Sequence, residues 1–234
     1  MKEKSYIKDN LLRIEQTICD ACDAVGRDRD EVTLTAVTKT VEPMFINEAI
    51  ACGVRHIGEN RVQEFLSKKP FLNLDGVQTH LIGHLQTNKV RQIVGEVSMI
   101  QSVDSFRLAQ MISQRAEKSA IKVPVLVEVN IGGEEQKSGV DPCQVEELMY
   151  QMSDLPGIQV RGLMTVAPIL QKEAEKRALF SKMYELFIDI RGKNIDNITM
   201  QDLSMGMSGD FREAIMEGAT IVRVGSAIFG RRQY

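Results

Sequence analysis

One lysine lies where a strand-like segment ends, and it could act as a nucleophile. The segment Thr33–Thr40 is short, β-branched and uncharged except for Lys39, a composition typical of a strand buried on both faces of a parallel sheet. An amine at the end of such a strand is partly removed from water, which favours its neutral form, and a neutral amine can attack a carbonyl. From this segment alone, the alternative is a lysine whose ammonium group stays in water.

Hydroxyls and glycines near the end of the chain form a pattern typical of phosphate sites. Ser208 and Gly209 are predicted to open a helix, where a hydroxyl and free N–H groups lie at the positive end of the helix dipole. Gly225 and Ser226 follow the last strand-like segment and offer close backbone approach and a second hydroxyl. Alone, Ser208 could be only a helix cap and Gly225 only a turn residue. Combined with Lys39, they predict a ligand with a phosphate at one end and an aldehyde or ketone at the other.

Pyridoxal 5′-phosphate (PLP) and phosphosugars both have this form, and Arg223 helps to separate them. Arg223 is a lone cation in an apolar strand, so we expect its buried guanidinium to face an acceptor. A pyridine nitrogen is a suitable acceptor, which favours PLP. Because arginine keeps its proton, this contact would leave the ring nitrogen unprotonated and the ring a weaker electron sink. The alternative is an outward-facing arginine paired with a helix carboxylate.

Two other motifs indicate no metal or redox chemistry. His80 and His84 lie four residues apart, but the chain is predicted to pass from strand to loop between them, and no carboxylate or cysteine completes a zinc set. Cys19 and Cys22 form a C-x-x-C pattern inside a predicted amphipathic helix, where buried thiols are expected. We therefore predict no metal site.

Composition excludes several classes of protein. The net charge of −3, the aromatic content of 5% and the absence of tryptophan argue against a nucleic-acid surface. No apolar run approaches the about 18 residues that span a bilayer, and the charged N-terminal segment lacks the apolar core of a signal peptide. We therefore expect a cytoplasmic protein that binds neither nucleic acid nor membranes.

The elements that must position these residues alternate between strand and helix. After an extra amphipathic helix from about Ser5 to Gly26, eight strand-like segments follow, each separated from the next by a helix-length segment. This alternation predicts an α/β fold with a parallel sheet, and eight units match a closed (β/α)8 TIM barrel. An open doubly wound sheet is the alternative, but it usually has about five or six strands and a glycine-rich first turn. We expect residues 1–234 to form a single domain.

The pattern also gives approximate boundaries. Strands are predicted at residues 33–39, 55–60, 79–83, 97–103, 123–130, 157–166, 198–204 and 220–225. Helices are predicted at residues 44–52, 61–69, 87–94, 105–119, 142–152, 172–191 and 209–217, with Asp104 and Asp141 as N-caps of two of them. Active sites of such barrels lie at the C-terminal ends of the strands, and the candidate residues named above all lie at predicted strand ends.

Several motifs in order make the chain similar to one family. It resembles the pyridoxal phosphate homeostasis proteins, single-domain relatives of the N-terminal barrel of alanine racemase, over nearly its whole length. The motifs that carry the resemblance are Ala36–Lys39, His56–Glu64, His80–Lys89, Val127–Asn130, Lys137–Gly139, Gly162–Thr165, Leu203–Asp210 and Val222–Gly230.

The resemblance implies specific roles for residues of this chain. Lys39 would form a Schiff base with PLP, Arg223 would face the ring nitrogen, and Asn60 would lie near the cofactor. The phosphate would be held by Ser208, Gly209, Gly225 and Ser226. Two positions depart from the family pattern. A lysine often found two residues after the Schiff-base lysine is Val41 here, which weakens any transfer of cofactor between neighbouring lysines, and an aromatic residue is replaced by Thr79.

The sequence favours a cofactor carrier over an enzyme. Related racemases add a C-terminal β domain that supplies an opposing tyrosine base, and a chain that stops at Tyr234 leaves no room for one. A two-base racemase needs acid and base groups on both faces of the substrate carbon, and only Lys39 has an obvious role. We therefore expect a monomer without robust turnover that acts in PLP homeostasis, storing PLP or delivering it to PLP-dependent apo-enzymes, with effects on amino-acid metabolism. A PLP-dependent amino-acid racemase and a Schiff-base aldolase acting on a phosphosugar are the alternatives.

Overall fold

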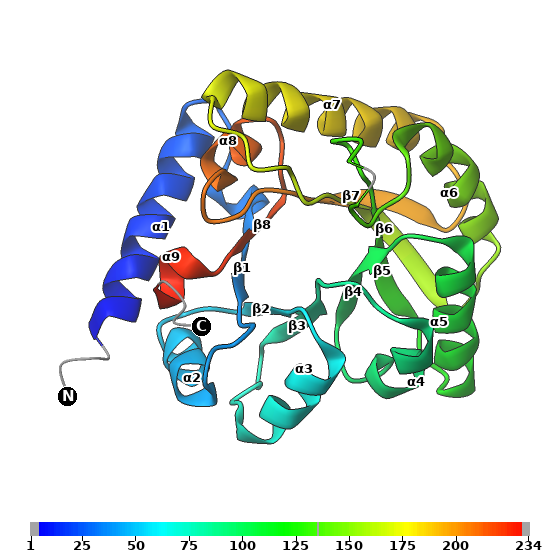
Figure 1. The fold of residues 1–234 in the computed structure, drawn as a ribbon, viewed down its shortest axis with the longest axis horizontal. Coiled ribbons are helices and arrows are strands. Elements are labelled where there is room, and N and C mark those ends of the chain that lie inside the picture. The colour runs from blue at the N-terminus through cyan, green and yellow to red at the C-terminus, as the bar shows by residue number, and fades with distance from the viewer. Residues whose placement is uncertain (1–4, 135, 231–234) are drawn as a thin grey trace.

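Eight parallel strands form a closed barrel in the computed structural model, which describes residues 5–134 and 136–230 (Figure 1). The strands pair in chain order, and the last pairs with the first. Their bounds are β1 (Thr33–Val37), β2 (His56–Glu59), β3 (Gln78–Leu81), β4 (Met99–Val103), β5 (Val123–Glu128), β6 (Ile158–Met164), β7 (Ile198–Ser204) and β8 (Ile221–Val224). The closed barrel predicted from the alternation is confirmed, and the open sheet is wrong.

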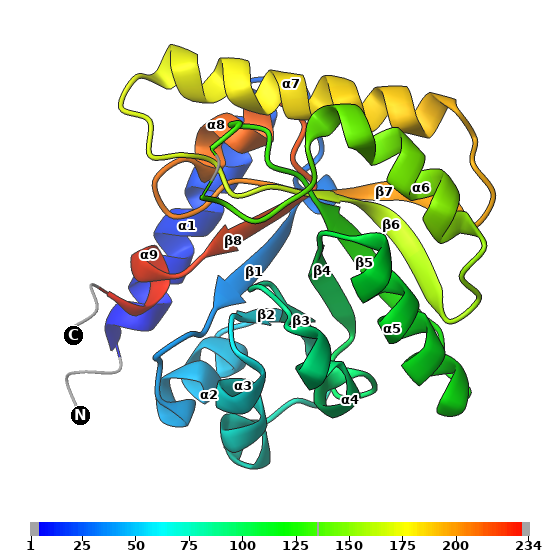
Figure 2. The same cartoon turned by 45° about the vertical axis from the view of Figure 1, so that its right-hand side comes forward.

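Helices surround the barrel on its outside (Figures 1 and 2). They are α1 (Ser5–Asp23), α2 (Pro43–Ala51), α3 (Val62–Lys68), α4 (Val90–Ile93), α5 (Phe106–Lys118), α6 (Val145–Ser153), α7 (Glu173–Gly192), α8 (Phe211–Met216) and α9 (Ser226–Phe229). The predicted extra helix is α1, which packs against α2, α8 and α9. Its apolar residues recur at helical spacing and are buried there, which explains why the segment is a helix on this surface; they are Ile7, Leu11, Ile14 and Ile18. Within the described ranges, no helix has the length and apolar character needed to cross a bilayer.

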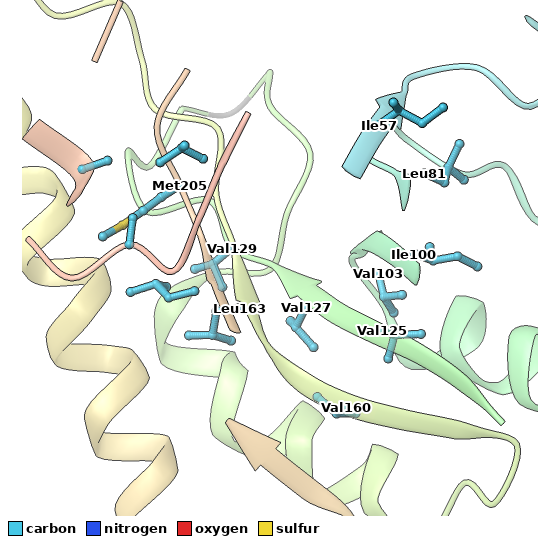
Figure 3. Close-up of a cluster of buried hydrophobic side chains, with 14 of the residues drawn as sticks. Ile57, Leu81, Ile100, Val103, Val125, Val127, Val129, Val160, Leu163 and Met205 are labelled. Atoms are coloured by element: carbon cyan, nitrogen blue, oxygen red, sulfur yellow. The ribbon is translucent and has the colours of Figure 1, made fainter. Parts of the chain in front are cut away.

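Most of the hydrophobic core lies between the strands and this helical layer. On β5, Val125 and Val127 point outward into the layer shown in Figure 3, together with Leu163 of β6. Alternate residues of a strand face opposite sides, so the residues between them face the barrel interior. Burying each such side chain stabilises the fold by about 1.5–3 kcal/mol relative to its exposure.

Two predicted helix starts are wrong. The N-cap of α5 is Ser105, whose Oγ accepts a hydrogen bond from the N–H of Leu108 at 3.4 Å, whereas Asp104 lies 3.4 Å from His84 Nδ1. The helix predicted from residue 209 is the short α8, which begins only at Phe211. Local capping patterns place a helix start only to within a few residues, so the competing hydroxyl of Ser105 was not distinguished from Asp104. Asp141 does cap the chain at the predicted point, but it caps a 3-10 turn at Pro142–Gln144 that leads into α6, which itself begins at Val145.

The interior of the barrel is partly polar. A separate apolar cluster fills one part of it, formed by Met99, Leu126, Met164 and Ile221. Two residues further along their strands, on the same inner face, Gln101 and Arg223 follow Met99 and Ile221 and are almost fully buried. Barrel interiors are usually filled by branched apolar side chains. Polar side chains buried at these positions are therefore unusual and must be balanced by specific hydrogen bonds.

His80 belongs to this polar interior, and it predicts how stability depends on pH. Burial, together with smaller contributions from nearby His56 and Arg161, lowers the pKa of His80 from 6.5 to about 3. The native state therefore stays unprotonated at this ring while the unfolded chain binds a proton below pH 6.5, so this stability is present above pH 6.5 and is lost as pH falls towards 3. Between pH 7 and pH 5, His80 alone should cost about 2 kcal/mol of unfolding free energy.

Denaturant unfolding of the wild type and His80→Gln at both pH values measures this effect. The variant should lose about 2 kcal/mol less than the wild type on acidification. Carboxylates titrate in both proteins over this pH range. The contribution of His80 is therefore the difference between the two proteins in the unfolding free energy that each loses on acidification. An equal loss in both would mean that His80 is accessible to protons in the native state.

Candidate functional site

A cavity of about 590 Å³ opens at the C-terminal ends of β1, β2, β3, β6, β7 and β8. Its wall includes every site residue singled out in the sequence, namely Lys39, Asn60, Ser208, Gly209, Arg223, Gly225 and Ser226. These residues lie up to 187 positions apart in the chain (39 to 226), and the parallel barrel brings them together because all its strand ends meet at one face.

Apolar side chains complete the cavity wall, and the sequence did not identify them. They are Val37, Ile82, Val166 and Met207. In the sequence they resemble ordinary core residues, and no local signal marks them as lining a site. Their apolar surfaces suit the faces of a flat ring, whereas a sugar would present hydroxyls to them.

The loop that carries Lys39 is fixed on both sides of this residue. The carbonyl of Thr38 accepts a hydrogen bond from Lys68 Nζ at 2.8 Å, and the N–H of Thr40 donates to Glu64 Oε1 at 2.5 Å. Thr40 has a φ of 61°, which is uncommon for a β-branched residue and persists only where the surroundings hold it. Lys39 itself lies two residues beyond β1 and is half-buried.

A buried ionic cluster joins this loop to the one that follows β2. Lys68 Nζ lies 3.1 Å from Glu59 Oε2 and 2.5 Å from Glu64 Oε1. Glu59 also accepts hydrogen bonds from Thr38 Oγ1 at 3.0 Å and from the N–H of Asn60 at 2.9 Å. Burial raises the pKa of Glu59, and the charge of Lys68 opposes this shift. The cluster therefore positions the backbone next to both Lys39 and Asn60.

Asn60 brings an unsatisfied acceptor to the cavity. Its Oδ1 is buried and has no hydrogen-bond partner among the residues that the structure describes. Gly83 packs directly against the backbone of Asn60. A Cβ atom at position 83 would lie only 2.8 Å from the Cα of Asn60, so a larger residue would not fit there. A buried acceptor without a partner is costly, so this position suits a ligand that donates a hydrogen bond.

Arg223 points into the barrel and is 3% exposed. Its Nη1 donates to Ser204 Oγ at 2.6 Å and its Nη2 donates to the carbonyl of Thr165 at 2.7 Å. Burial lowers the pKa of Arg223 to about 10, while the charges of Glu128 and Asp210 raise it, so the guanidinium stays charged at neutral pH. The outward-facing alternative is wrong.

Glu128 is a titratable group near the site that the sequence reasoning missed. It is 8% exposed and occupies an inner position of β5. Burial and the charge of Asp104 raise the pKa of Glu128 to about 7, against the opposing charges of Arg223 and His84. Its only sequence signal is a carboxylate at the end of an otherwise apolar strand.

The loops after β7 and β8 are joined by one hydroxyl. Ser208 Oγ accepts hydrogen bonds from the N–H groups of Gly225 at 3.1 Å and Ala227 at 3.4 Å. The N–H groups of Gly209 and Ser226 have no acceptor within residues 5–134 and 136–230. Ser208 lies two residues before the N-cap of α8, so the predicted helix-end role is wrong. The N–H groups and hydroxyls of these two segments are what could hold an anion, with Gly225 as the N-cap and Ser226 as the first residue of the short helix α9.

The metal and redox patterns bring no further chemistry to the cavity. His80 is buried inside the barrel and His84 is exposed, and the described ranges contain no group of three or more His, Cys, Asp or Glu side chains that could hold a metal ion. Cys22 is buried on α1 and Cys19 is partly buried there, both as free thiols. The cavity thus offers an amine, a buried guanidinium, loop donors for an anion and apolar walls, which together fit PLP.

Comparison with known proteins agrees with this combination. The family model "Alanine racemase, N-terminal domain" matches residues 23–233. The chain is 44% identical over 226 residues to the pyridoxal phosphate homeostasis protein of Aquifex aeolicus, covering 97% of this chain and 98% of the relative.

Solved structures show the same similarity. The crystal structure of an unknown protein from Bifidobacterium adolescentis superimposes with a TM-score of 0.92 at 39% identity, covering 98% of this chain and 97% of that one. PipY of Synechococcus elongatus, in a structure with PLP bound, superimposes with a TM-score of 0.84 at 34% identity, covering 96% of this chain and 100% of that one. The chain therefore belongs to the pyridoxal phosphate homeostasis protein family, whose barrel is that of the alanine racemase N-terminal domain.

Proposed function

We propose that this chain binds PLP in the cavity at the C-terminal ends of its strands and acts in PLP homeostasis by storing or delivering the cofactor. The observation that carries the proposal is the convergence of Lys39, Arg223 and the two loops around Ser208 and Ser226 on one cavity. The structure of PipY with PLP bound supports it, because that chain shares this fold over its full length.

Lys39 is the proposed attachment point. Its amine attacks the aldehyde carbon of PLP, a C=N bond replaces the C=O bond, and one water leaves, so that the product is a Schiff base. The half-buried position of Lys39 in a loop fixed by Lys68 and Glu64 holds the amine at the cavity without the entropy cost of ordering a free loop.

Arg223 and the loop residues are the proposed non-covalent contacts. Arg223 donates to the ring nitrogen and keeps it unprotonated, since a guanidinium retains its own proton. Asn60 lies beside the cofactor. The phosphate binds the hydroxyls and N–H groups at Ser208, Gly209, Gly225 and Ser226.

The same cavity supports a carrier rather than a racemase. A two-base racemase needs an acid or base on the face of the substrate opposite the lysine. Among the described residues of the wall, no carboxylate, histidine or tyrosine accompanies Lys39. Because one chain supplies the whole wall, a monomer suffices, and PLP-dependent apo-enzymes are the proposed recipients.

Attachment to Lys39 is tested by absorption and labelling. Purified protein mixed with PLP should gain an absorption band that borohydride removes, and peptide mass mapping should place the reduced label on Lys39. Lys39→Ala should lose the label and bind PLP at least about tenfold more weakly, equivalent to about 1.4 kcal/mol. Lys182→Ala, on the exposed face of α7, should behave as wild type. A label spread over surface lysines, or unchanged in Lys39→Ala, would contradict the assignment, and a label from a phosphosugar alone would favour the aldolase.

The carrier role is tested by turnover and transfer. PLP-loaded protein should not racemise amino acids at the about 1–1,000 per second typical of enzymes, measured by chiral chromatography, and it should reactivate a PLP-dependent apo-enzyme. Sustained racemisation by the wild type that disappears in Lys39→Ala would show that the racemase alternative is right.

A further inference from the structure

We propose that Gln101 is a positioning residue for Arg223. It acts through Ser204, and its amide donates in turn to His80, which donates to His56. The consequence for ligand binding rests on the proposed function, whereas the hydrogen-bond chain itself does not.

The chain of hydrogen bonds runs through the barrel interior from the cavity to its opposite end. Arg223 Nη1 lies 2.6 Å from Ser204 Oγ, which lies 2.7 Å from Gln101 Oε1. Gln101 Nε2 lies 2.7 Å from His80 Nδ1, and His80 Nε2 lies 3.2 Å from His56 Nδ1. The five residues come from β8, β7, β4, β3 and β2.

Arg223 sets the direction of every bond in this chain, because a guanidinium only donates. Ser204 Oγ accepts from Arg223, so its single hydrogen points to Gln101 Oε1. Gln101 then presents its NH2 group to His80 Nδ1, which must accept. This assigns the neutral Nε2–H tautomer to His80, which donates to His56 Nδ1.

The protonation states required by this direction fit the surroundings of the two rings. Burial lowers the pKa of His56 and of His80, so both rings are neutral at pH 7 and each has an acceptor nitrogen. His56 is only half-buried, and it borders a second cavity of about 450 Å³ near α1 and the first residues of β1 and β2. The other ring nitrogen of His56 can therefore donate to water, and the hydrogen-bond chain ends without an unsatisfied donor.

Gln101 matters to Arg223 because the guanidinium has few other partners. Its second contact is the carbonyl of Thr165, and among the described residues Glu128 and Asp210 act on it through their charges without forming an ion pair. If Gln101 no longer accepts the hydrogen bond from Ser204, the Ser204 hydroxyl is free to rotate. Its lone pairs are then no longer directed at Arg223. The guanidinium then loses its fixed orientation towards the cavity.

Two variants interrupt the hydrogen-bond chain at different residues. Gln101→Met removes both the acceptor of Ser204 and the donor of His80 with little change in length, whereas Ser204→Ala removes the hydroxyl that joins Arg223 to Gln101 and keeps the Gln101 amide beside His80. Ser113→Ala is the control, because Ser113 is equally buried and hydrogen-bonded but takes no part in this hydrogen-bond chain.

Nitrogen NMR of the protein without added cofactor tests the chain directly. In the wild type, His80 should carry its proton on Nε2, and the Arg223 N–H groups should exchange slowly with water. Gln101→Met and Ser204→Ala should each allow His80 to carry its proton on either ring nitrogen and should each speed the exchange of the Arg223 N–H groups, whereas Ser113→Ala should change neither. A proton on His80 Nδ1 in the wild type, or unchanged Arg223 exchange in Gln101→Met, would overturn the proposal.

Absorption spectra with bound PLP test the consequence for the ligand. Gln101→Met and Ser204→Ala should each shift the spectrum in the direction that Arg223→Gln shifts it and weaken binding by about 3- to 10-fold, while Ser113→Ala should do neither. If Arg223→Gln changes the spectrum and affinity but Gln101→Met does not, Gln101 does not position Arg223. If the wild type binds no PLP, the proposed function fails, and the NMR measurements still decide whether Gln101 holds Arg223.

Discussion

The charge of Arg223, buried inside a parallel barrel, is the constraint on which the site depends. Removing an isolated ion from water is costly unless fixed dipoles or opposite charges replace the water. Here Ser204 Oγ and the carbonyl of Thr165 replace it at 2.6 and 2.7 Å, and Glu128 and Asp210 contribute charge from a greater distance. This requirement explains why the interior includes a polar layer where barrels of this type usually have branched apolar side chains.

A second constraint fixes the opposite wall of the cavity. Lys68, Glu59 and Glu64 form a mostly buried ionic cluster that binds the backbone on both sides of Lys39 and the N–H of Asn60. Loss of Lys68 would leave both carboxylates without their cation, which is more costly than the ion pairs are stabilising. Lys39 and Arg223 are thus held by two separate networks, and the loops at Ser208 and Gly225 are joined by a third set of bonds.

Much of this arrangement could be predicted from the sequence because it follows from topology. Once eight strand and helix units indicate a barrel, the strand ends must meet at one face, and the convergence of Lys39, Asn60 and Arg223 follows. The helix start at Ser208 was wrong because local patterns do not settle where a short helix begins. The contact of Gln101 with Ser204 and His80 could not be foreseen, because it joins β4 to β7 across the interior and leaves no periodic signal in the sequence.

A crystal structure of the chain with PLP most directly tests the claim that this cavity is the cofactor site. We expect continuous density from Lys39 Nζ to the cofactor, the ring nitrogen facing Arg223, and phosphate oxygens at about 2.7–3.2 Å from donors at Ser208, Gly209 or Ser226. PLP bound elsewhere, such as in the cavity beside His56, or bound here with its phosphate at Arg223, would contradict it.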